Sequence, residues 1–206
     1  MPNPVSTRAQ RRRAGIVLTA LTLLESIPVV ESLSGVRILG FWPLGRILTT
    51  PANALGWVLA AFVAVAFVAL TAARNAAIRS RLSRIDTLKP IALALALASG
   101  ITEELFFRGV VMDVLARHGA GAFAQIAISA AIFGAVHVVW IGFAGPRGVL
   151  GIIGATTLLG AALAVVYLAA GRSVVPCVAA HVAINAALEP WLVLTAVERR
   201  WGPDRR

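Results

Sequence analysis

The amino-acid sequence predicts an all-α protein, a polytopic transmembrane helical bundle with about six spans. Of its 206 residues, 59% are hydrophobic and 14% are charged, against about 45–50% and about 25% in an average soluble domain. The mean hydropathy is +0.85, and a soluble domain of this size could not bury so much apolar surface. Aromatic residues make up only 7%, which disfavours a membrane β-barrel with alternating faces.

The net charge of +10 comes from 19 lysine and arginine residues and nine aspartate and glutamate residues. The basic residues cluster at the ends of apolar runs, which is typical of topology signals rather than of a nucleic-acid-binding surface. We therefore expect the lipid bilayer as a partner and no nucleic acid. The one cysteine, Cys177, excludes an internal disulfide and a cysteine-rich metal cluster. The bias toward arginine and alanine indicates a GC-rich bacterial genome.

The apolar runs predict six membrane helices, each long enough to cross a hydrocarbon core. They cover residues 14–35, 52–73, 90–117, 121–143, 148–170 and 173–197. The first run follows a tail with four arginines and is interrupted by Glu25, Pro28 and Glu31. We interpret it as an imperfect helix that is retained, because no signal-peptide cleavage site closes it. Residues 36–51, with glycine, proline, arginine and aromatic side chains, are predicted to form an interfacial loop.

The third run is the longest and carries the most polar residues. Pro90 is predicted to start it, because a proline loses no hydrogen bond in the first turn of a helix. A helix over residues 90–117 reaches about 42 Å, which exceeds a hydrocarbon core of about 30 Å. Glu103 and Glu104 are therefore expected near mid-depth. In the last run, we expect Pro190 to kink or break the helix.

The distribution of basic residues predicts the orientation of the bundle. With the N-terminus inside, the inner segments carry fourteen lysines and arginines and the outer loops carry four. Arg108 lies within the third run. This asymmetry follows the positive-inside rule, and an odd number of spans would remove it. We therefore expect a multi-pass protein of the plasma membrane with both termini in the cytoplasm.

Three groups of polar residues interrupt the spans, and ionisable groups there are functional candidates because they are costly in a membrane. The first is the segment EELFFR, residues 103–108. Glu104 and Arg108 are four residues apart and can pair on one helix face, whereas Glu103 has no such partner in its own helix. A buried, unpaired carboxylate can act as a general base near neutral pH. The alternative is an ion-pair cluster that fixes helix packing.

The other two groups each contain a histidine. His137 follows Phe133 by four residues in the fourth run, and a lone histidine in a span is often only hydrogen-bonded to a neighbouring helix. His181 and Asn185 are one turn apart in the last run. Two such side chains on one face can donate hydrogen bonds to a single oxygen, which is the geometry that an oxyanion needs. The alternative for this pair is an interhelical polar contact.

The motifs EExxxR, FxxxH and HxxxN occur in this order on three separate spans. In these motifs, residues 90–190 resemble the CAAX protease and bacteriocin-processing (CPBP or Abi) family of intramembrane proteases, which includes enzymes like CAAX prenyl protease 2. Eukaryotic relatives in this family remove the last three residues of prenylated CAAX proteins. The apolar runs and basic residues predict a basic tail with two membrane helices over residues 1–89 and a basic tail over 198–206, and the resemblance implies a catalytic core over 90–197.

The resemblance also implies the site residues. The catalytic residues would be Glu103, His137, His181 and Asn185, with Glu104 and Arg108 as a supporting pair. Glu103 matches the glutamate that activates water, and His137 matches the histidine that helps to hold that water. His181 and its partner match the residues that stabilise the oxyanion. A depth count puts His137 several residues nearer the inner face than Glu103, so tilt or a shifted helix has to bring them level.

Zinc is the alternative to a metal-free site. Glu103, His137 and His181 could hold a zinc ion with one open position, and the metal would make its bound water more acidic. Against zinc, the sequence lacks an HExxH motif, and Asn185 beside His181 is more typical of an oxyanion donor. We therefore expect no cofactor.

The leading interpretation is an intramembrane endopeptidase that acts on a peptide or protein substrate at the membrane, with or without a prenyl group. One alternative is a non-catalytic membrane scaffold or a bacteriocin immunity protein. Another is a small transporter that uses Glu103 and Glu104 as proton carriers, although no inverted repeat supports it. A cysteine protease is the least favoured, because Cys177 follows a proline in an apolar helix and is typical of a packing residue.

Overall fold

The computed structural model of the protein describes residues 6–34 and 50–201, and within them all regular structure is helical. The predicted interfacial loop over residues 36–51 lies almost wholly outside the described residues. In chain order, the elements are α1 (Arg8–Ser34), α3 (Ala54–Arg74), α4 (Ala76–Arg79), α5 (Leu88–Glu104), a π-helix (Leu105–Met112), α6 (Asp113–Arg117), α7 (Ala122–Val136), a 3₁₀-helix (His137–Trp140), α8 (Ile141–Ala169) and α9 (Val175–Trp201). The predicted all-α class is confirmed.

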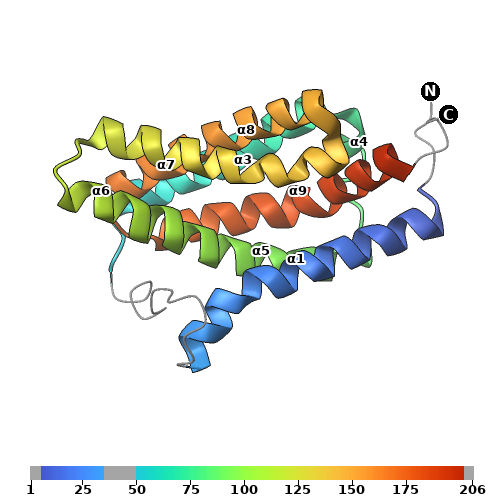
Figure 1. Ribbon diagram of the computed structural model, residues 1–206, viewed down its shortest axis with the longest axis horizontal. Coiled ribbons are helices and arrows are strands. Elements are labelled where there is room, and N and C mark those ends of the chain that lie inside the picture. The colour runs from blue at the N-terminus through green and yellow to red at the C-terminus, as the bar shows by residue number, and fades with distance from the viewer. Residues whose placement is uncertain (1–5, 35–49, 202–206) are drawn as a thin grey trace.

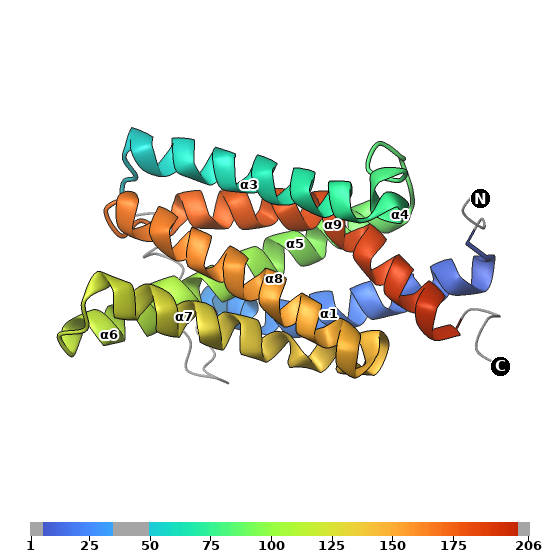
Figure 2. The same cartoon turned by 90° about the horizontal axis from the view of Figure 1, so that it is seen from above.

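Five helical stretches are long and apolar enough to cross a membrane. One of them, Ala122–Ala169, has 48 residues and would reach about 72 Å as a straight helix, more than twice the hydrocarbon core. Its two halves, α7 and α8, instead pack side by side (Figures 1 and 2). This stretch therefore accounts for two crossings, and the protein is a polytopic bundle of about six spans.

The turn between α7 and α8 differs from the predicted boundaries. The sequence suggested a loop between residues 143 and 148, whereas helical structure begins again at Ile141 and runs on to Ala169. Gly145 breaks the helical geometry within this stretch, with φ 70° and ψ 173°. Glycine adopts a positive φ without steric cost, so the chain reverses at this one residue rather than in a separate loop.

Helix α9 contains Pro190 and remains a continuous helix from Val175 to Trp201. Figure 2 shows that α9 changes direction along its length, as a helix does when a proline removes one of its backbone hydrogen bonds. Of the two expected outcomes, a kink or a break, the structure shows the kink. Because the helix continues, residues before and after Pro190 stay in one helical register.

Glycines allow the helices around the site to approach closely. A Cβ atom on Gly100 of α5 would lie 2.7 Å from Val182 Cγ2 on α9, and one on Gly56 of α3 would lie 2.5 Å from Ala170 Cβ. Both distances are too short for a real side chain, so only glycine fits. Small residues at helix contacts let membrane helices pack at short range. The Gly100 contact lies one turn before Glu104 and holds this part of α5 against α9.

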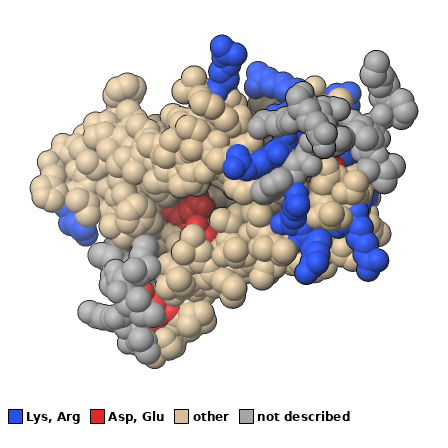
Figure 3. Space-filling model, turned by 45° about the vertical axis from the view of Figure 1, so that its right-hand side comes forward, with Lys and Arg blue, Asp and Glu red and all other residues tan. Residues whose placement is uncertain are grey.

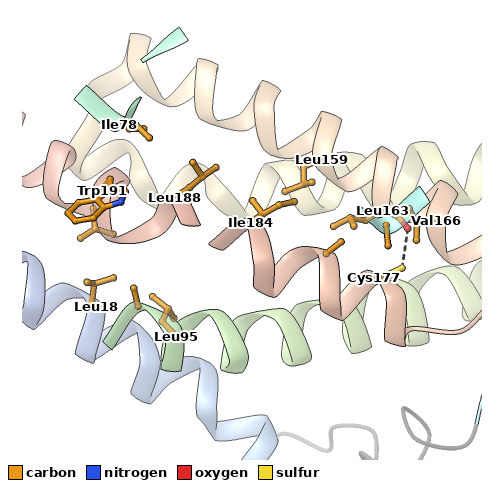
Figure 4. Close-up of a cluster of buried hydrophobic side chains, with 14 of the residues drawn as sticks. Leu18, Ile78, Leu95, Leu159, Leu163, Val166, Cys177, Ile184, Leu188 and Trp191 are labelled. Atoms are coloured by element: carbon orange, nitrogen blue, oxygen red, sulfur yellow. Dashed lines mark hydrogen bonds between the residues drawn. The ribbon is translucent and has the colours of Figure 1, made fainter. Parts of the chain in front are cut away.

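The buried core lies between α1, α5, α8 and α9 (Figure 4). Leu18, Leu95, Leu163 and Trp191, one from each of these helices, are each at most 2% exposed. Cys177 lies in the same cluster, where its thiol donates a hydrogen bond to the Leu163 carbonyl at 3.4 Å. The core fixes α5 against α9, and these two helices carry most of the polar residues singled out above.

Basic side chains gather at one end of the bundle (Figure 3), where α1 begins and α3 and α9 end. We call this the arginine-rich end, and it comprises Arg8, Arg11, Arg12, Arg13, Arg74, Arg79, Arg81, Arg84, Arg199 and Arg200. Ion pairs link separate segments of the chain there. Arg11 of α1 pairs with Asp86, and Arg81 binds both carboxylate oxygens of Glu198 at 3.1 and 2.9 Å.

Candidate active site

The two glutamates of the first motif lie where α5 passes into the π-helix Leu105–Met112. Helix α5 begins at Leu88, so Glu103 and Glu104 lie about 22–24 Å along it, deep in the span. A π-helix is rare, and π-helical turns within α-helices are frequent at functional sites. Here the π-helix carries Arg108, the last residue of the motif.

Glu104 is the centre of a buried network of charged groups. Its Oε1 accepts hydrogen bonds from Arg108 Nη1 at 3.0 Å and from His181 Nδ1 at 2.8 Å. The Glu104 and Arg108 side chains are 0% exposed. The guanidinium also donates to the Gly160 carbonyl at 2.9 Å and lies 5.1 Å above the Phe133 ring. The predicted pairing of Glu104 with Arg108 is therefore confirmed, and the network joins three spans.

Glu103 stands apart from this network, because neighbouring residues of a helix point about 100° apart. Its side chain is half-buried, and it forms no ion pair with any residue that the structure describes. Its Oε2 is buried without a hydrogen-bond partner in the described part of the chain. The charges of His181, Glu25, Glu104 and Arg108 all act on Glu103. Its carboxylate is therefore close to the buried network and not neutralised by it.

His181 and Asn185 both face α5, one turn apart on α9. Since Glu104 accepts the hydrogen bond, His181 carries a proton on Nδ1, and its Nε2 has no partner among the residues described. Asn185 Nδ2 donates to Ser99 Oγ at 3.2 Å, which ties it to the turn of α5 before Glu103. His181 Nε2 and the second N–H of Asn185 Nδ2 therefore remain available for a ligand. A site for an oxyanion needs two such groups directed at one oxygen.

His137 lies at the start of the 3₁₀-helix that follows α7. Its Nδ1 donates to the Phe133 carbonyl at 2.7 Å, because a carbonyl only accepts, and this leaves Nε2 as the acceptor of the neutral ring. The Phe133 ring lies 5.1 Å from the His137 ring and 5.9 Å from the His181 ring. The structure thus brings the two histidines to one aromatic ring. No hydrogen bond joins His137 to Glu103 in the described residues.

The zinc alternative needs Glu103, His137 and His181 as one set of ligands. Across residues 6–34 and 50–201, no three histidine, cysteine, aspartate or glutamate side chains come together as a metal-binding group. The residues as arranged therefore do not fit a three-ligand zinc site, and no step below passes through a metal.

Two acidic residues near the site were missed or left open by the sequence. Glu189 follows His181 and Asn185 at the same four-residue interval on α9, and this spacing is the signal that could have found it. Glu25 of α1 was noted without a role. Its backbone carbonyl accepts a hydrogen bond from Thr102 Oγ1 at 2.9 Å, so α1 is held beside the residue that precedes Glu103. No sequence signal distinguishes Thr102 from other hydroxyl residues in apolar helices.

Membrane-crossing helices around a buried glutamate, arginine and histidine network define a polytopic membrane protein with a polar site inside its bundle. Residues 86–187 match the family described as Rce1-like, type II CAAX prenyl endopeptidases. This part of the chain belongs to that family, which confirms the resemblance to the CAAX proteases. The match indicates a CAAX-type protease, which is a peptide hydrolase, and the apolar helices indicate a protein of the membrane. The comparisons with curated proteins and with solved structures found no match.

Proposed function

We propose that this protein is an intramembrane endopeptidase in which Glu103 activates a water molecule without a metal ion. One observation carries the assignment. Glu104 is bound by Arg108 and His181, whereas the adjacent Glu103 has no cationic partner among the described residues. The two glutamates therefore suit different tasks, since one is a fixed structural anion and the other is available as a general base.

The first step is attack by water on the scissile carbonyl carbon. Glu103 takes a proton from the water molecule while the water oxygen forms a bond to the carbonyl carbon. His137 supports this step through Nε2, which can accept the second hydrogen bond of the same water, since its Nδ1 is occupied by Phe133. Exclusion of bulk water by the surrounding helices keeps the attacking molecule in place.

The negative charge then develops on the carbonyl oxygen, where His181 and Asn185 act as hydrogen-bond donors. For His181 to donate from Nε2 while Nδ1 donates to Glu104, its ring has to carry a positive charge. The Glu104 carboxylate, 2.8 Å from Nδ1, supplies the matching negative charge. Asn185 donates without any change in protonation.

The intermediate collapses as the C–N bond breaks. The proton that Glu103 took from water passes to the leaving nitrogen, which departs as an amine. The other product is a carboxylic acid, whose proton returns to solution, so Glu103 ends as the carboxylate it was at the start. The reaction adds one water to one peptide bond and needs no redox partner.

The experiment compares peptide termini in membranes from cells that express the native protein or Glu103→Gln at matched levels. Glu198→Gln is the control, because it is the same change from glutamate to glutamine at a residue of α9 that lies at the arginine-rich end, away from the site. We expect some peptide termini to appear with the native protein and with Glu198→Gln but to be absent with Glu103→Gln. If Glu103→Gln leaves every terminus unchanged in a host that carries the substrate, the enzyme assignment is wrong and a scaffold or immunity role replaces it.

The metal-free assignment has its own test. Protein dialysed to equilibrium against buffered zinc should hold far less than one zinc per chain, and cleavage should survive chelators. Stoichiometric zinc together with activity that is lost on chelation and regained with zinc would overturn the assignment, even if Glu103 is essential.

We further propose that both termini lie in the cytoplasm of a cell with this protein in its plasma membrane. The support is the excess of arginine at the end where α1 begins and α9 ends. Single-cysteine reporters, placed at residues 84 and 119 in a Cys177→Ser background, should react with an impermeant thiol reagent from opposite sides. Labelling of residue 84 from outside intact cells would reverse the orientation.

A further inference from the structure

Three glutamates from three helices gather beside the candidate active site. Glu103 comes from α5, Glu25 from α1 and Glu189 from α9. Glu189 feels the charge of Glu103 most strongly, and then those of His181 and Glu25. Glu25 in turn interacts with His181. Figure 3 shows acidic atoms at the base of a hollow in the surface of the bundle. Two of these residues, Glu25 and Glu189, lie outside the region that matches the family.

Glu189 is held in register with the predicted oxyanion donors. It lies one turn after Asn185 and two turns after His181 on α9, which is continuous across Pro190. The separation along the helix from His181 is about 12 Å. An extended peptide rises about 3.3 Å per residue, so a substrate with its scissile carbonyl at His181 would reach Glu189 about two to four residues away, depending on the side chain.

None of the three carboxylates has a cationic partner among the residues that the structure describes. One oxygen of Glu103 and one oxygen of Glu189 are buried and make no hydrogen bond to the described part of the chain. Glu104, a few ångströms away along α5, has both an arginine and a histidine. Burying several like charges without a counter-ion is unfavourable, so a positive group bound in the hollow would stabilise the ionised carboxylates.

A basic side chain fits this group of carboxylates better than a single metal ion does. The described acidic and histidine side chains do not come together in a metal-binding group of three. A lysine or arginine side chain combines an apolar stem, which suits the interior of a membrane bundle, with a charged end that reaches carboxylates. A basic side chain of the substrate fits both requirements.

We propose that Glu189 and Glu25 form a specificity subsite that binds a lysine or arginine of the substrate two to four residues from the scissile bond. This inference rests on the proposed endopeptidase function and names the substrate class for the same site. Glu103 is the base of the reaction, and the two other glutamates select the substrate by charge. They act on substrate affinity rather than on the chemical step.

The first test digests a library of membrane peptides with the native protein, Glu189→Gln, Glu25→Gln and the control Glu198→Gln, all in the same detergent. For the native protein, we expect cleaved peptides to be enriched about tenfold in lysine or arginine at one position two to four residues from the cut, which corresponds to about 1.4 kcal/mol. Either site variant should lose most of this enrichment, whereas Glu198→Gln should keep it.

A matched pair of peptides then separates binding from chemistry. One peptide carries lysine at the preferred position, and the other carries norleucine there. Relative to the norleucine peptide, Glu189→Gln should raise KM about tenfold for the lysine peptide, and any change in kcat should be the same for both peptides. A purely structural role for Glu189 would change both peptides alike. No basic preference in the native protein, or a preference that survives both site variants, overturns the inference.

A binding measurement distinguishes failure of this inference from failure of the proposed function. The lysine peptide should raise the thermal midpoint of the native protein more than the norleucine peptide does, because a ligand stabilises the state that binds it. Glu189→Gln should abolish that difference. If the difference is seen and no peptide is cut, the subsite stands and hydrolysis fails. If peptides are cut and the two peptides stabilise equally, hydrolysis stands and the subsite fails.

Discussion

Two regions of the bundle pair acidic with basic side chains, and they differ in what surrounds the charges. Glu104 and Arg108 lie within a span, and both side chains are 0% exposed. At the arginine-rich end, Arg81 is 6% exposed and its partner Glu198 is 21% exposed, while Arg11 is 37% exposed and its partner Asp86 is 5% exposed. Each of these pairs therefore has one member that reaches solvent. A partner lost at that end is replaced by water, whereas a partner lost within the span is not replaced. The buried network therefore positions the site, and the pairs at the end fasten helices together.

The largest effect should follow from removing one member of the buried network. Glu104→Ala leaves the Arg108 guanidinium buried without its counter-ion, which costs about 3–5 kcal/mol of unfolding free energy. It also releases His181, so cleavage should be lost. Reversible unfolding in mixed micelles measures the stability, and peptide cleavage measures the activity.

A double variant separates the two effects. Replacing both residues, Glu104→Leu together with Arg108→Leu, removes the pair without leaving a buried charge, and such replacements are often neutral or stabilising. We expect near-native stability and no cleavage. Equal instability in the single and double variants would show that packing, and not charge compensation, is what Glu104 contributes.

The next largest effect should be on activity alone. Asn185→Ala removes one predicted oxyanion donor, and loss of such a donor costs about 10²- to 10³-fold in kcat. KM should change little, because the donor acts on the transition state. Ser99→Ala, which removes the group that receives the Asn185 hydrogen bond, should reduce kcat by a smaller factor of about ten. If Asn185→Ala raises KM and leaves kcat intact, the residue binds the ground state instead.

A smaller effect is expected at the arginine-rich end. Arg81→Ala removes a bidentate ion pair with Glu198, which links the segment before α5 to α9. Because the remaining carboxylate can be hydrated, the loss should be about 1 kcal/mol of unfolding free energy, with kcat/KM unchanged. A loss as large as that of Glu104→Ala would remove the difference between the two regions.

The sequence predicted the spans well because the signals for them are local. Apolar runs, basic ends and Pro90 at a helix start are each properties of one segment, and the helices lie close to the predicted bounds. The pairing of Glu104 with Arg108 was also predictable, since both lie on one helix. The reversal at Gly145 and the unbroken α9 were not, because they depend on the backbone at single residues and on packing against neighbouring helices.

The candidate site shows the same limit. The motif residues could be identified from spacing, but their partners on other helices could not. The bond of His181 to Glu104, the bond of Asn185 to Ser99 and the contact of two histidines with Phe133 all join different spans. Glu189 could have been identified from the sequence, because it continues the four-residue interval of His181 and Asn185. Its proposed role, however, also depends on Glu25, which comes from a helix far away in the sequence.

The smallest effect should appear in the acid stability of the arginine-rich end. Burial alone would raise the pKa of Asp86, but the Leu88 backbone N–H and the Arg11 guanidinium outweigh it and hold the pKa below its usual range. A carboxyl group whose pKa is lower in the folded state stabilises the protein above the unfolded value of about 3.9, and this contribution is lost as pH falls through the folded value.

Comparing the native protein with Asp86→Asn at pH 6 and at pH 3 isolates that contribution, because all other carboxyl groups are common to both. Native protein should lose more unfolding free energy between these two pH values than the variant does. The difference should stay below about 1 kcal/mol, since Arg11 is 37% exposed and solvent screens the pair. An equal loss in both proteins would mean that water replaces this pair at no cost, which would make the contrast with the buried network sharper still.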